Sequence, residues 1–261
     1  MKIVADRISK GHAGIPLPER TVVFETGRVT IAEAEVGDQP TVLSLILSGR
    51  MRSDSGVVTL DGVDDAALIQ ERVALVDAPE VSEPAADLPL RTVVREELMF
   101  AGRSTSRATV AATIADAGGS DYAAVRIADV PAAIRVRILA ELAAFRRGVE
   151  GLVITAPDRH GGDPRDWLAV ASDLAARDFA VLVVCGAPSA EITLPLLPQP
   201  EPANTPTPLP KQPASTPQGP AGADRLDASG VAGVYGRRHP TDPPQPTPEE
   251  PQAQKPEEAG K

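Results

Sequence analysis

The stretch AEVGDQPT, from Ala34 to Thr41, has the most informative chemistry of the chain because it joins an extended segment to an apolar helical pattern. A loop in this position can wrap phosphates with backbone N–H groups when it supplies glycines, a lysine and a final hydroxyl. Only Gly37 and Thr41 are of the required types. Pro40 occupies the lysine position and has no backbone N–H, and Gln39 replaces a glycine.

The charge of this stretch also opposes a phosphate ligand. Glu33, Glu35 and Asp38 place carboxylates where a triphosphate would lie. At about 4 Å and an effective dielectric near 20, one pair of unit charges is worth about 4 kcal/mol. Micromolar to millimolar nucleotide binding totals only about 4 to 8 kcal/mol. Loss of the lysine would therefore remove much of the affinity.

Composition divides the chain into two parts. Its 261 residues are 42% hydrophobic, but most of the 27 prolines follow residue 194, with threonine, glutamine and glutamate among them. Such a segment buries too little apolar surface to fold. We therefore expect a folded domain over residues 1–190 and a disordered, proline-rich tail over residues 191–261.

Net charge and special residues limit the function classes. A net charge of -10 disfavours nucleic-acid partners. The single cysteine, Cys185, lies in the apolar run FAVLVVC, which predicts a buried structural thiol and excludes an internal disulfide. The first residues lack a signal-peptide pattern, and no apolar run reaches the roughly 18 residues of a membrane span. We expect a cytoplasmic protein.

Hydrophobic periodicity predicts an α/β fold. Short strand patterns come first, in KIVADRI, TVVFET, RVTIAEA and GVVTLDG, and TVLSLILSGRM reads as a helix. Residues 92–145 have a mostly helical pattern. GLVITAP and FAVLVVCG are continuous apolar runs of the kind found in central parallel strands, and the helical pattern DWLAVASDLAARD separates them.

The order of these segments resembles the nucleotide-binding domain of an ABC transporter over residues 1–187. TVLSLILSGRMRSDSGVVTLDG looks like the helix and strand after the Walker A loop, and RVALVDAP like the strand leading to the Q-loop. The remaining landmarks are LPLRTVVREEL, RVRILAELA, LVITAPDRHGGDP and FAVLVVCG. The resemblance implies a P-loop NTPase-like cassette with a mostly parallel sheet, N-terminal antiparallel strands and a helical subdomain over about 92–145.

The family's catalytic positions are substituted in this sequence. The resemblance places the Walker B aspartate at Thr155 and the general-base glutamate at Ala156. Threonine carries no charge for Mg²⁺, and alanine cannot accept a proton. The Q-loop glutamine position falls on Ala78, and the switch-histidine position on Gly186.

The signature motif is also substituted, whereas the D-loop keeps its family-like appearance. The signature position reads ADVPA from Ala128, so Asp129 would face a partner's phosphate with the wrong sign and Pro131 removes a donor. Asp163 with Pro164 resembles the D-loop, with one extra residue after Pro157.

Other polar residues have simpler interpretations. We expect His160 to be a solvated loop residue rather than a base. We expect Asp163 to cap a helix rather than to pair with Asp166 around a metal. The arginines of the helix around residue 140 read as a solvated face, with an acidic partner as the alternative. They are Arg135, Arg137, Arg146 and Arg147.

These observations favour a degenerate, non-hydrolysing ABC-cassette-like protein that is a structural or regulatory subunit of a membrane transport or export complex. It would need no cofactor, would bind a membrane permease through a coupling-helix groove, and would lie at the inner membrane through that partner. Homodimer and heterodimer both stay open. The alternatives are an active ATPase that binds ATP and Mg²⁺, alone or with a complete partner cassette, and a soluble adaptor.

The tail has its own predicted role. Its proline-rich runs favour the polyproline II conformation, which would make the tail a ligand for a partner domain that binds proline-rich segments. A plain linker is the alternative. Within it, DRLDASGVAGVYGRRHP is poor in proline and contains Tyr235, Arg237 and Arg238. These three residues are the candidate partner-binding segment.

Overall fold

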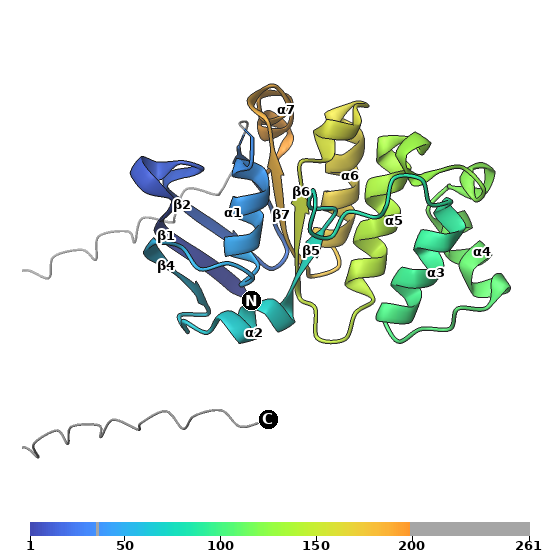
Figure 1. Ribbon diagram of the computed structural model, residues 1–261, viewed down its shortest axis with the longest axis horizontal. Coiled ribbons are helices and arrows are strands. Elements are labelled where there is room, and N and C mark those ends of the chain that lie inside the picture. The colour runs from blue at the N-terminus through green and yellow to red at the C-terminus, as the bar shows by residue number, and fades with distance from the viewer. Residues whose placement is uncertain (35–36, 199–261) are drawn as a thin grey trace, which may run out of the picture. The chain divides into compact units, whose positions relative to one another are not determined.

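A computed structural model describes residues 1–34 and 37–198, and its contacts divide the chain into the units Met1–Asn204 and Thr205–Lys261. Tyr235, Arg237 and Arg238 lie outside the described residues, as does the rest of the tail beyond residue 198. Within the described part of the first unit, two β-sheets and seven α-helices form an α/β fold (Figure 1).

The first sheet is antiparallel and built from β1 (Lys2–Lys10), β2 (Leu17–Glu25) and β4 (Ser55–Leu60), in the order β2-β1-β4. Ile3, Ala5 and Phe24 are buried on its inner face, and more exposed residues such as Lys2, Val4 and Val23 alternate with them. This alternation is the pattern of a sheet with one face in solvent.

The second sheet is parallel, with the order β3-β7-β6-β5. Its strands are β3 (Val29–Glu33), β5 (Val73–Val76), β6 (Gly151–Thr155) and β7 (Ala180–Cys185). Every residue of β5, β6 and β7 is buried. Their uniformly apolar sequences follow from this position, because helices cover both faces of a parallel sheet. The α/β fold class expected from the sequence is confirmed.

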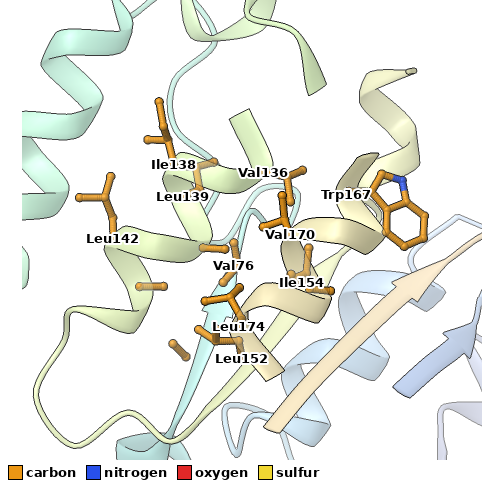
Figure 2. Close-up of a cluster of buried hydrophobic side chains, with 14 of the residues drawn as sticks. Val76, Val136, Ile138, Leu139, Leu142, Leu152, Ile154, Trp167, Val170 and Leu174 are labelled. Atoms are coloured by element: carbon orange, nitrogen blue, oxygen red, sulfur yellow. The ribbon is translucent and has the colours of Figure 1, made fainter. Parts of the chain in front are cut away.

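Two hydrophobic clusters lie on the two faces of the parallel sheet. On one face α1 (Gln39–Leu47) packs between the two sheets. On the other face α5 (Ala132–Ala144) and α6 (Pro164–Ala175) cover the strands, with Trp167, Leu142 and Leu174 among the buried side chains (Figure 2). Alternate residues of β7 enter the two clusters, and Cys185 is buried, as predicted.

Further helices complete the described part. Beyond α5 lie α3 (Leu90–Phe100) and α4 (Arg107–Asp116), so the region expected to be helical is helical (Figure 1). Short elements are α2 (Ala66–Arg72) and the 3₁₀ turns η1 (His12–Gly14), η2 (Ser120–Tyr122), η3 (Ile127–Asp129) and η4 (Pro157–His160). After β7, α7 (Ala187–Thr193) and η5 (Leu194–Leu196) carry regular structure past residue 190. No helix among the described residues is long and apolar enough to cross a membrane.

Candidate functional site

A cleft with a volume of about 990 Å³ lies at the carboxyl ends of the four parallel strands, β3, β5, β6 and β7. Ligands of open parallel α/β sheets bind at this edge. The residues predicted from the sequence that line it are Ala34, Gly37, Pro40, Thr41, Ala156 and Gly186. The fold therefore brings together positions from both ends of the domain.

The N-terminus of α1 forms one wall of the cleft. Asp38 is the N-cap residue, but its side chain makes no capping hydrogen bond. Gly37 has a φ of +52°, a conformation that glycine adopts without strain. Pro40 lies in the first turn of α1, where a phosphate cradle needs backbone donors, and supplies none. Glu35 lies outside the described residues.

The charged side chains of the cleft are mostly acidic. Asp38, Glu80 and Asp158 line it, and Arg159 is the one cation among the lining residues. The Arg159 guanidinium is already engaged: Nη1 donates to the carbonyl oxygens of Asp77 at 2.6 Å and Thr155 at 2.9 Å. The residues present do not fit a magnesium triphosphate, because carboxylates face its place and no lining lysine opposes them.

At the ends of β6 and β7, Thr155, Ala156 and Gly186 have no carboxylate or imidazole that could bind a metal or act as a base. Thr155 is buried, and its Oγ1 has no hydrogen-bond partner among the described residues. Ala156 has a left-handed backbone, and its N–H donates to the Val184 carbonyl at 2.7 Å. The N–H of Gly186 donates to Asp158 Oδ2 at 2.9 Å. Asp158 therefore fixes the loop after β7 with one of its oxygens.

A buried ionic cluster lies directly behind the cleft, around Asp77 at the end of β5. Arg135 of α5 forms a bidentate pair with this carboxylate, at 2.7 Å to Oδ1 and 2.9 Å to Oδ2. Arg159 lies 3.1 Å from Oδ1, and His160 Nε2 lies 3.0 Å from Oδ2. The cluster thus joins β5, α5 and η4, three elements that are distant in the sequence.

These contacts keep Asp77 ionised. Burial by itself raises the pKa of the Asp77 carboxyl, but the hydrogen bonds from Arg135 and His160 and the charges of Arg135 and Arg159 together outweigh it. The pKa of Asp77 falls to about 2. Both oxygens of the Asp77 carboxylate are occupied by its three partners, so its role is to connect elements of the fold.

Two expectations from the sequence are wrong here. His160 is not a solvated loop histidine, because its side chain is only 16% exposed and contacts Asp77. Arg135 does not belong to a solvated helix face, because its side chain is 2% exposed. Arg137 pairs with Asp173 at 3.1 Å.

The remaining predicted residues lie outside the cleft lining. Gln39 begins α1, and Ala78 is fully buried after β5. Asp129 pairs with Arg126 at 2.7 Å, on η3. Asp163 is the N-cap of α6, where its Oδ1 accepts a hydrogen bond from the Arg165 N–H at 2.9 Å. The capping role expected for Asp163 is confirmed.

Asp77 is not among the residues predicted from the sequence, although two features of the sequence indicate a buried ion pair. Asp77 ends a fully apolar strand, where a carboxylate needs a partner. Arg135 shares a helical face with Leu139 and Leu142, at i, i+4 and i+7, so the periodicity placed it on the buried side of α5.

Comparisons with known proteins agree with this architecture at the level of fold. No protein-family model matches the chain, and no curated protein matches it. One similar solved structure is the ATP-binding subunit of an ABC transporter, with 14% identity over 74% of this chain and 82% of that one, and a TM-score of 0.50. Another is a nucleotide-free ATP-binding cassette from an ABC transporter, with 15% identity, coverage of 76% and 85%, and a TM-score of 0.54.

These similarities to solved structures concern the fold. The chain has the fold of an ABC-transporter ATP-binding cassette, with its parallel sheet, antiparallel sheet and helical region in the same arrangement.

Proposed function

We propose that this protein is a non-hydrolysing ABC-cassette-like subunit with a structural or regulatory role in a membrane transport or export complex. The observation that carries the proposal is the chemistry of the cleft. Asp38, Glu80 and Asp158 line the cleft, Pro40 stands where the resemblance implies a phosphate-binding lysine, and Arg159 is held by backbone carbonyls.

The proposed partners follow from the fold. ABC cassettes work as pairs and grip a permease through a groove beside the Q-loop and the helical region. Such a groove depends on shape and apolar contact, so it can persist after the nucleotide site is lost. The proposed location is therefore the cytoplasmic side of the inner membrane, where the protein is held by the permease. Pairing with a second cassette, identical or different, is part of the same proposal.

The second candidate is an ATPase that shares a composite site with a complete partner cassette. Gly37 and Thr41 favour it, because both line the cleft next to the N-terminus of α1. The acidic lining residues oppose it.

Isothermal titration calorimetry of the full chain with ATP, with and without Mg²⁺, distinguishes the non-hydrolysing subunit from the ATPase. We expect no saturable heat up to about 1 mM nucleotide, which corresponds to less than about 4 kcal/mol of binding free energy. A Gln39→Gly/Pro40→Lys variant, which restores a glycine, a backbone donor and a cation, should bind more tightly than the natural chain. Low-micromolar binding or Mg²⁺-dependent turnover by the natural chain would refute the proposal.

A further inference from the structure

A group of exposed apolar side chains lies at the C-terminal ends of α3 and α5. Met99 is 59% exposed, Phe100 is 69% exposed and Phe145 is 37% exposed. Leu98, next to them in sequence, is buried. Because α5 ends just before β6 begins, this end of the molecule lies at the amino ends of the parallel strands, away from the cleft (Figure 1). We call Met99, Phe100, Arg103 and Phe145 the α3–α5 patch.

Specific contacts hold the patch together. Arg146, which follows Phe145, donates to Glu97 Oε2 of α3 at 2.7 Å. The guanidinium of Arg103 lies over the ring of Phe145, 5.2 Å from its centroid. An ion pair and a cation–π contact between the two helix ends favour a preformed surface, which reduces the entropy lost when a partner binds.

A hollow adjoins the patch on the side of α4. Phe145, Ile138 and Ala117 form its apolar wall, and its volume is about 250 Å³. The polar residues that also line it are Thr113, Asp116, Arg137, Glu141 and Arg177. A hollow of this size accommodates one or two apolar side chains. Interfaces obtain most of their affinity from such anchors in pockets.

The charges around the patch are mixed, because Glu96 and Glu97 precede it on α3 and Asp116 and Glu141 line the hollow, but three nearby arginines lack a carboxylate partner in the described part of the chain. Arg103, Arg107 and Arg147 are exposed. None of the three forms a salt bridge with any residue that the structure describes. The surface therefore combines apolar anchor points with guanidinium groups that form no salt bridge among the described residues, although that of Arg103 also stacks on Phe145, and these groups suit an acidic partner.

We propose that the α3–α5 patch binds an acidic amphipathic helix of a partner protein. The apolar stripe of that helix covers Met99 and Phe100, one of its side chains enters the hollow beside Phe145, and its carboxylates pair with Arg103 and Arg147. This is recognition of a helix in a groove through anchors at i, i+3, i+4 and i+7. A protein is favoured over an anionic lipid surface because the hollow beside Phe145 suits a single inserted side chain, which a layer of lipid headgroups does not supply. The site is separate from the cleft, so it holds whether or not nucleotide binds.

The test measures binding of a designed probe to the full chain by fluorescence anisotropy. The probe is an 18-residue peptide with leucine at the i, i+3, i+4 and i+7 positions and glutamate elsewhere. We expect a Kd in the micromolar range that weakens with salt. A peptide with lysine in place of every glutamate should bind at least about tenfold more weakly.

Variants locate the binding surface. Met99→Ser/Phe100→Ser should weaken binding of the acidic peptide by about tenfold or more, and Arg103→Gln/Arg147→Gln should reduce both affinity and its salt dependence. Val63→Ser is the matched control, because Val63 is similarly exposed but follows β4. Circular dichroism and thermal unfolding verify that each variant is folded.

Three results would overturn the proposal. The first is no binding of the acidic peptide up to about 1 mM, the range of very weak affinities. The second is equal binding by the lysine peptide or by the Met99→Ser/Phe100→Ser variant. The third is sedimentation of the chain with phosphatidylglycerol vesicles, abolished by the same variant, without peptide binding, which would assign the patch to a membrane.

Discussion

Replacement of Asp77 with alanine tests whether the buried cluster joins the strands to the helical region. Both oxygens of Asp77 accept hydrogen bonds from Arg135, and Arg159 and His160 lie within 3.1 Å. Alanine leaves the Arg135 guanidinium buried without its anion. Removal of one partner of a buried ion pair costs about 3 to 5 kcal/mol. For a domain of this size, each kcal/mol lowers Tm by about 2 to 4 °C, so we expect a decrease of about 10 °C.

The assay is urea unfolding followed by the fluorescence of Trp167, the single tryptophan, which is buried in α6. Asp64→Ala is the control, because Asp64 is exposed and should change stability by less than about 0.5 kcal/mol. Asp77→Ala/Arg135→Leu should recover part of the loss, since it removes the unpaired buried cation. A loss below about 1 kcal/mol in Asp77→Ala, or a double variant that is less stable than Asp77→Ala, would show that the cluster is not a stabilising junction.

The remaining predictions concern titration, thiol reactivity and capping. The pKa of Asp77 falls from its ordinary value of 3.8 to about 2, so its ionisation stabilises the fold above about pH 4, and about 2 kcal/mol is lost as pH falls towards 2. Urea titrations at stepwise pH should show this loss in the natural chain, and an equally steep loss in Asp77→Asn would contradict it. Burial raises the pKa of the Cys185 thiol to about 12, so maleimide should label Cys185 at pH 8 only after unfolding; rapid labelling of the native chain would contradict its burial. Asp163→Ala should lower Tm, and Asp163→Ser should restore it because serine also caps α6, whereas a Mg²⁺-dependent Tm in the natural chain alone would favour a metal site instead.

The fold was largely predictable because it follows from local patterns. The apolar runs that end at Thr155 and Cys185 predicted central parallel strands, and both are fully buried strands. The landmarks before them predicted a helical region from about residue 92 to 145, and that region contains α3, α4 and α5. Such patterns are readable because a strand buried on both faces must be apolar throughout.

The ionic cluster was less predictable because Asp77 is 58 or more positions away from each of its partners. Whether Arg135 meets Asp77 depends on how α5 packs on β5. His160 shows the same limit: its loop reads as solvated, yet η4 turns the imidazole towards Asp77. Contacts of this kind arise from packing between elements, which no local pattern encodes.

The sequence by itself determined which side chains the cleft lacks. Proline at position 40, threonine at 155 and alanine at 156 provide neither a cation, nor a metal carboxylate, nor a base, wherever the chain places them. Only the tertiary structure decided what the cleft contains instead. It places Asp38 and Asp158, which are far apart in sequence, at one sheet edge and directs Arg159 to backbone carbonyls, because parallel strands bring their carboxyl ends together.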